Sequence, residues 1–100
     1  MPTDAEKRDH PRKEFVVEAV LESSAGRVQS RISDISLGGC YVDSIAMAVK
    51  GEHLSLAIMW QGQRRYFTGE VAYVLPGFGF GIRFTELDEE QTEFLRRIIG

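Results

Sequence analysis

The sequence predicts a mostly β protein, a small six-stranded antiparallel β-barrel with a C-terminal helix and a flexible N-terminal segment. Two observations lead to this fold class. Apolar and polar residues alternate with a period of two in six stretches separated by turn residues, and only the last stretch of the chain has apolar residues at helical spacing. Several short strands in 100 residues favour a closed barrel, because closure removes the exposed edges of a flat sheet.

The chain length allows one compact domain with one core. Residues 1–14 are polar and include Pro2 and Pro11, a composition typical of a tail. We therefore expect a flexible segment over residues 1–14 and a barrel domain with its helix over residues 15–100.

The first two expected strands form a hairpin. Residues 15–22 alternate so that one face is apolar, residues 23–26 provide the turn, and residues 27–32 return with one polar side facing water. Small, turn-forming residues from Ser33 to Gly39 predict a loop. Further strands are expected at residues 40–42, 54–59, 65–75 and 79–84.

Residues 87–99 are expected to form the C-terminal helix. Asp88 and Gln91 stand three positions apart and match an N-cap and the residue that completes a capping box. Acidic residues in the first turn and arginines in the last suit the helix dipole, which is a sufficient structural explanation for this charge order.

Composition limits the function classes. The formal net charge of −3 argues against general binding to a nucleic-acid polymer or an anionic membrane. No apolar run approaches the roughly 20 residues that span a bilayer, and the N-terminus lacks a signal-peptide pattern, so neither membrane insertion nor export is expected. The single cysteine, Cys40, cannot form an internal disulfide, which favours the cytoplasm.

A basic cluster lies in the N-terminal segment. Lys7, Arg8, Arg12 and Lys13 fall within seven residues of a chain whose net charge is negative. The guanidinium group presents a planar set of donors that fits phosphate oxygens and the O6 and N7 edge of guanine. Two arginines four apart on an extended segment can therefore hold one nucleotide from two sides. The alternative is a solvated basic tail without a ligand.

A second cluster lies in the predicted loop. Asp34 can accept hydrogen bonds from the N1 and N2 edge of guanine, Ser36 can donate or accept, and Gly38 and Gly39 let backbone approach a ligand. The alternative is a tight β-connection in which Asp34 and Ser36 bond only to their own backbone.

Together the two clusters resemble the motifs of PilZ domains. Arg8-Asp-His-Pro-Arg12 matches RxxxR, and Asp34-Ile-Ser-Leu-Gly-Gly39 matches [D/N]xSxxG, in the same order and at a similar separation. Residues 69–73 and 78–84 also look like the closing strands of that family. The resemblance implies a six-stranded barrel with a C-terminal helix, and a bacterial receptor for cyclic di-GMP.

The resemblance also implies roles for particular residues. Arg8 and Arg12 would contact guanine edges and phosphates, while Asp34, Ser36 and Gly39, with Gly38 beside them, would bind the other guanine on the barrel surface. A basic residue just before the first arginine accompanies a stacked pair of ligands in the family, so Lys7 favours two ligand molecules.

The resemblance and the basic segment together suggest a mechanism. The segment would order on the dianionic ligand, and the changed surface would be read by a downstream protein partner. The alternative is an adaptor with the same fold and no ligand, although such PilZ domains typically lack the two motifs.

No other chemistry is expected. His10 and His53 are far apart, and no Cys, His and acidic residues have metal-ligand spacing, so neither a metal nor a cofactor is predicted. No nucleophile elbow surrounds Ser36, so we expect no catalysis. Trp60 and Tyr66 flank a predicted turn and are expected to pair across strands or, if exposed, to contact a partner.

Overall fold

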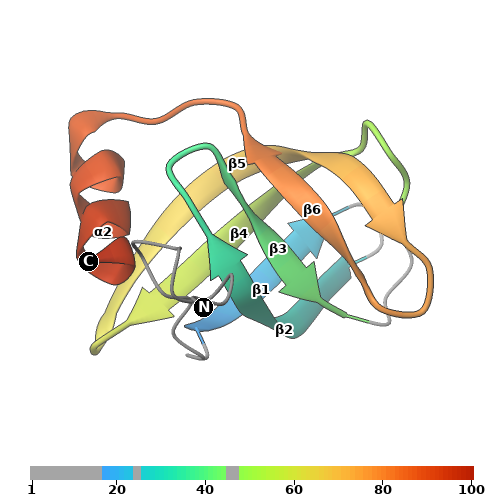
Figure 1. Ribbon diagram of the computed structural model, residues 1–100, viewed down its shortest axis with the longest axis horizontal. Helices are drawn as coiled ribbons and strands as arrows, with labels where there is room; N and C mark the ends of the chain where they lie inside the picture. Colours follow the sequence, from blue (N-terminus) through green and yellow to red (C-terminus); the bar gives the residue numbers. More distant parts are fainter. Residues whose placement is uncertain (1–16, 24–25, 45–47) are drawn as a thin grey trace, which may run out of the picture.

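The structure is a computed structural model that describes residues 17–23, 26–44 and 48–100. In that part of the chain six strands form a barrel, and one helix lies at its end (Figure 1). The elements are β1 (Val17–Ser23), β2 (Gly26–Ile35), β3 (Gly39–Asp43), β4 (His53–Trp60), β5 (Gln63–Leu75), β6 (Gly79–Phe84) and α2 (Glu89–Ile99).

The strands close into a barrel in the order β1-β2-β3-β6-β5-β4, with β4 returning to β1. Every pairing is antiparallel. Sequence neighbours form four of the six pairings, whereas β3 with β6 and β1 with β4 join strands that are distant along the chain. The predicted closed, six-stranded antiparallel barrel is confirmed.

Alternating side chains of the strands fill the barrel. The fully buried positions include Phe67, Leu56, Ile58, Val42 and Val71, and they form one core with residues from α2. This arrangement follows from the period of two, because every second residue of a strand points to the same face. The polar residues between them face outward.

β2 is longer than predicted, and the loop predicted from Ser33 to Gly39 is correspondingly shorter. β2 continues to Ile35, and the turn that follows spans only residues 36–38, since Gly39 already belongs to β3. The register with β3 shifts between Ile32 and Asp34, so Ile32 and Ile35 are both buried although they are three residues apart. Such a bulge breaks the strict alternation, so the period of two in the sequence ends at Ile32 although the strand continues.

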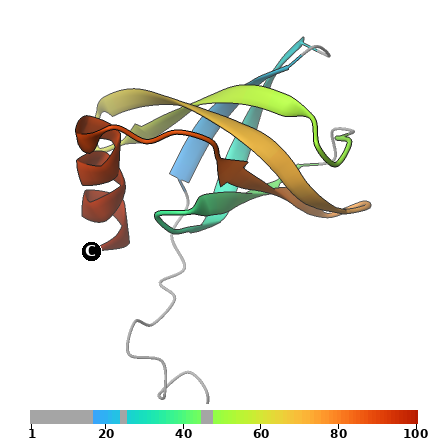
Figure 2. The same cartoon turned by 90° about the horizontal axis from the view of Figure 1, so that it is seen from above.

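The C-terminal helix lies across one end of the barrel (Figure 2). Its apolar residues Phe94, Leu95 and Ile98 are buried in the core. The helix begins at Glu89, two residues later than expected, because Asp88 is the N-cap. The capping box predicted from Asp88 and Gln91 is present.

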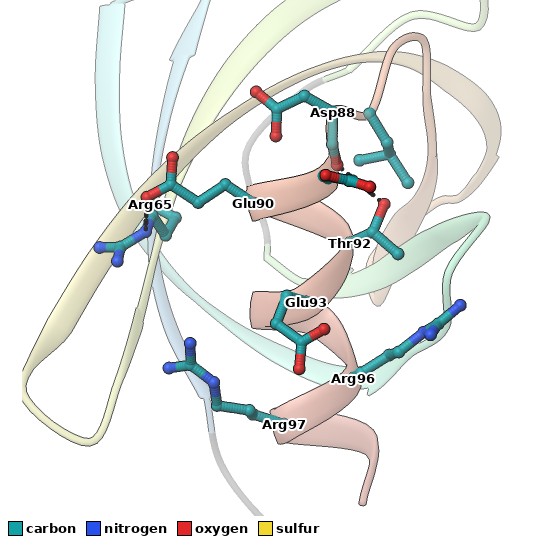
Figure 3. Close-up of a pocket in the computed structure, with 9 residues that line it drawn as sticks. Arg65, Asp88, Glu90, Thr92, Glu93, Arg96 and Arg97 are labelled. Carbon is teal, nitrogen blue, oxygen red and sulfur yellow. Dashed lines mark hydrogen bonds and ion pairs between the residues drawn. The ribbon is translucent and has the colours of Figure 1, made fainter.

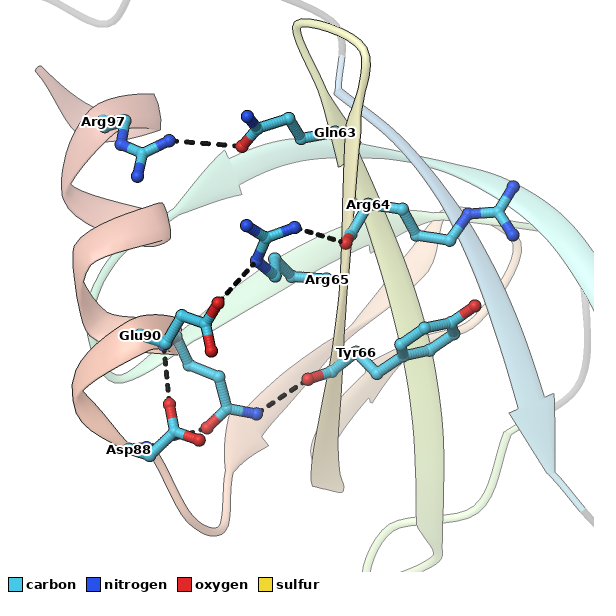
Figure 4. A network of polar contacts seen from close by, with 8 residues as sticks. Gln63, Arg64, Arg65, Tyr66, Asp88, Glu90 and Arg97 are labelled. Carbon is cyan, nitrogen blue, oxygen red and sulfur yellow. Dashed lines mark hydrogen bonds and ion pairs between the residues drawn. The ribbon is translucent and has the colours of Figure 1, made fainter.

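Polar contacts hold α2 against β5 (Figure 4). Gln91 Nε2 donates to the backbone carbonyl of Tyr66 at 2.7 Å, and Arg97 donates to the side-chain oxygen of Gln63 at 3.2 Å. Arg65 lies over the ring of Phe94, 5.5 Å from its centroid. These contacts fix the position of the helix relative to the barrel.

Within the part of the chain that the structure describes, no helix has the length and apolar character to cross a membrane.

Candidate functional site

The turn between β2 and β3 is closed by Ser36. The Ser36 amide donates to the carbonyl of Gly39 at 2.8 Å, and the Ser36 hydroxyl accepts from the amide of Gly38 at 3.2 Å. These bonds agree with the alternative interpretation for Ser36, in which its side chain binds its own backbone. Ser36 and Gly38 are exposed, so both also lie at the surface where a ligand can reach them.

The two glycines of the turn have different surroundings. A Cβ atom on Gly39 would lie 2.0 Å from the backbone oxygen of Ile82, whereas one on Gly38 would meet nothing nearer than the Ser36 hydroxyl at 3.9 Å. The carbonyl of Gly38 accepts from the amide of Phe84 at 2.9 Å. Gly39 is therefore required for the close approach of β3 and β6, a role that the sequence interpretation had assigned to ligand approach alone.

Asp34 lies on the outer face of β2, exposed and opposite Tyr41 of β3. Burial, with the Asp34 carboxylate as a second cause, raises the pKa of the Cys40 thiol to about 12. Cys40 is therefore a protonated core residue at neutral pH, in agreement with its interpretation as a small residue at the start of a strand.

The topology brings the start of β1 close to this turn. Val17 pairs with Ile32, two residues before Asp34 on β2. Figures 1 and 2 both show the first residues of β1, the β2–β3 turn and α2 at the same end of the barrel. The predicted ligand residues Lys7, Arg8 and Arg12 precede Val17 and lie outside the described residues.

Two hollows lie elsewhere, beside α2. One of about 840 Å³ runs along the helix, and charged side chains dominate its lining, including Arg65, Glu90, Glu93 and Arg96 (Figure 3). The other, of about 690 Å³, lies between β5 and the start of α2. Arg65 and Glu90 approach to 3.7 Å and help to anchor the helix. Neither of these two hollows contains a residue of the β2–β3 turn.

Among the residues that the structure describes, no three His, Cys, Asp or Glu side chains form a group able to hold a metal ion. The prediction that Trp60 and Tyr66 pair across the β4–β5 turn is wrong. Trp60 is opposite Gln63 and Tyr66 is opposite Ala57, so the two aromatic residues are not cross-strand neighbours. Tyr66 is exposed instead.

The family model of the PilZ domain matches residues 6–100. The chain belongs to the PilZ domain family. The resemblance inferred from the two motifs is thereby confirmed at the level of the family.

Two solved structures share this fold. The chain is similar to the PilZ domain of CeSA from a cellulose-synthesising bacterium, with 17% identity and a TM-score of 0.65 over 86% of this chain and 91% of that one. It is also similar to the Borreliella burgdorferi PlzA protein in complex with c-di-GMP, with 20% identity and a TM-score of 0.60. That match covers 83% of this chain and 32% of PlzA, so the chain spans about a third of its length. No curated protein sequence matches the chain.

Sequence reasoning missed several outward residues of this PilZ domain. Arg83 of β6 lies directly opposite Gly39 and pairs with Glu70 of β5. Tyr41 and Tyr73 stack on the outer face with ring centroids 6.2 Å apart. Alternation predicts that Tyr41 and Arg83 face outward, but it places Tyr73 and Leu75 on the same face as the buried Phe67 and Val71. That expectation is wrong, because the register with β6 shifts between Val71 and Tyr73 and leaves Tyr73 and Leu75 exposed. Only the strand register shows that Arg83 borders the turn.

Proposed function

We propose that this PilZ domain is a receptor for cyclic di-GMP that binds the dinucleotide between Arg8 and Arg12 on one side and the β2–β3 turn on the other. The observation that carries the proposal is the position of Val17, next to the strand that carries Asp34. The basic segment therefore enters the barrel beside the turn that holds the second motif.

The length of the chain permits the contact. Arg12 precedes Val17 by five residues, so it can reach about 18 Å from that point, and Arg8 can reach about 32 Å. From strand spacing and rise, the backbone of Asp34 lies only about 9 Å from that of Val17. Both arginines can therefore contact a ligand seated on the turn.

The chemistry of the two sides is complementary to a guanine dinucleotide. The exposed Asp34 carboxylate accepts from guanine N–H groups, while the guanidinium groups supply charge for the phosphates. Lys7 adds a further positive charge and favours a stacked pair of ligand molecules.

The proposed signal is a changed surface. Ligand binding orders residues 7–12 over the turn, and the new surface at this end of the barrel recruits a downstream protein. Cytoplasmic localisation, favoured by the unpaired thiol of Cys40, places the domain where a nucleotide messenger is available.

Isothermal titration with cyclic di-GMP tests the proposal. Arg8→Ala and Arg12→Ala should each lower affinity by about 30-fold or more, because truncating one partner of a charged contact costs about 2–5 kcal/mol. Arg27→Ala is a matched control, since Arg27 pairs with Glu22 at the opposite end of β1. The receptor function is excluded if the unaltered chain shows no binding, and the two-sided site is excluded if all three variants bind equally.

A ligand-independent adaptor remains the second candidate, favoured by exposed apolar residues at the other end of the barrel. Phe78 is 74% exposed, and Leu75 is exposed beside it in the β5–β6 hairpin. An amide NMR titration separates the candidates. Shifts at Gly38 and Gly39 on adding cyclic di-GMP support the receptor, and an unchanged spectrum supports the adaptor.

A further inference from the structure

Arg83 borders the β2–β3 turn on the side opposite β2. It stands directly across from Gly39 in the β3–β6 register, and the neighbouring amide, that of Phe84, donates to the carbonyl of Gly38. Opposed positions of antiparallel strands lie about 5 Å apart at Cβ and face the same side. The Arg83 side chain therefore rises from the outer surface beside the turn.

The guanidinium of Arg83 is exposed and has one acidic partner. Its Nη2 lies 2.5 Å from Glu70 Oε1, and the side chain is 62% exposed compared with 28% for Glu70. Because the Arg83 side chain stays largely in contact with water in this pair, the pair contributes little to stability. Arg83 can therefore leave Glu70 for a better partner at low cost.

The acidic side chains near the turn would oppose the binding of an anionic ligand. Asp34 and Glu70 both face outward near it, and both would repel the phosphates of a dianionic ligand. A guanidinium next to Gly39 offsets this repulsion and presents paired donors to a phosphate or to the O6 and N7 edge of guanine.

We propose that Arg83 is a third arginine ligand for the dinucleotide, supplied by the barrel itself, and that Glu70 holds it in the free protein. This inference rests on the proposed receptor function. On binding, the Arg83 guanidinium turns from Glu70 to the ligand, so Glu70 competes with the ligand for the same group and lowers its apparent affinity.

Isothermal titration of variants with cyclic di-GMP tests the inference. Arg83→Gln should lower affinity about 10-fold, as expected for loss of a hydrogen bond to a charged group. Arg83→Lys keeps the charge without the planar donors and should recover only part of the loss. Glu70→Gln should raise affinity about threefold by releasing Arg83.

Controls separate a direct contact from a general effect of charge. Arg27→Gln and Glu22→Gln alter a similar exposed ion pair at the far end of the β1–β2 hairpin and should change affinity by less than about twofold. The gain from Glu70→Gln should also disappear in the double variant with Arg83→Gln, because the gain requires the released guanidinium.

The outcomes distinguish the inference from the function on which it rests. If the unaltered chain does not bind cyclic di-GMP, both are overturned. If it binds, and Arg83→Gln weakens binding no more than Arg27→Gln, the role of Arg83 alone is overturned. A gain from Glu70→Gln that persists without Arg83 would mean that Glu70 acts only by repulsion, which also contradicts the proposed exchange.

Discussion

Gly39 has two roles, one in the sequence motif and one in the packing of β3 against β6. It is the last residue of the [D/N]xSxxG motif, and its missing side chain also lets the backbone of β3 approach Ile82 of β6. Ser36 is similar, because its hydroxyl accepts from the Gly38 amide while remaining at the surface. The motif is therefore part of the barrel's construction as well as of its proposed site.

This double role predicts different effects for two adjacent glycines. Gly39→Ala should lower the free energy of unfolding by about 1–3 kcal/mol, because the new methyl group cannot fit against the Ile82 carbonyl without a backbone shift. Gly38→Ala, whose Cβ would meet only the Ser36 hydroxyl at 3.9 Å, should change it by less than about 0.5 kcal/mol. Urea unfolding measures both, and equal stability of the two variants would contradict the packing role.

At the scale of elements, β2 shows what a sequence pattern misses. Its alternation predicts a strand that ends at Ile32, whereas the strand continues past a bulge to Ile35. The bulge inserts one residue, so the inward positions are three apart and the period of two is lost locally. The pattern of α2 has no such interruption, and its capping box and buried face were predicted correctly.

The capping box of α2 makes a measurable contribution to stability. Asp88 accepts from the Gln91 amide at 2.7 Å, and the Gln91 side chain accepts from the Asp88 amide at 2.8 Å. Asp88→Ala should lower the free energy of unfolding by about 1 kcal/mol, because it leaves a helix N–H group without its acceptor. Chemical denaturation tests this, with Glu93→Ala on the exposed face as control. A loss as large for the control would show that the cap is not the cause.

At the scale of the whole molecule, packed groups connect the turn to the helix. The Phe84 amide donates to Gly38, the Phe84 ring lies 5.2 Å from that of Phe67, and the Phe67 ring lies 6.2 Å from that of Phe94 in α2. A ligand that stabilises the turn therefore acts on residues that pack against the helix. This continuity provides a physical route by which ligand binding at the turn can reach α2.

Hydrogen exchange tests that route. Saturating cyclic di-GMP should slow amide exchange around Phe94 and Leu95 by about 5-fold or more, the lower end of usual coupling between sites. Amides near Arg27, in the β1–β2 hairpin at the other end of the barrel, should be unaffected. Protection confined to the turn would mean that ligand binding does not reach α2.

The sequence by itself determined the strands, the helix and the family. Strand and helix periods are local properties, and the capping box and the two motifs are each contained in a few consecutive residues. For this reason the closed barrel, α2 and membership of the PilZ family could all be predicted before the structure was known.

Only the tertiary structure decided which residues surround the turn. The position of Arg83 beside Gly39 and the start of β1 beside β2 both depend on register between separate segments. Alternation within a strand states which face a residue occupies, but barrel closure sets its neighbours on that face. The pairing of β3 with β6 joins segments about 40 residues apart, a distance over which no local pattern carries information.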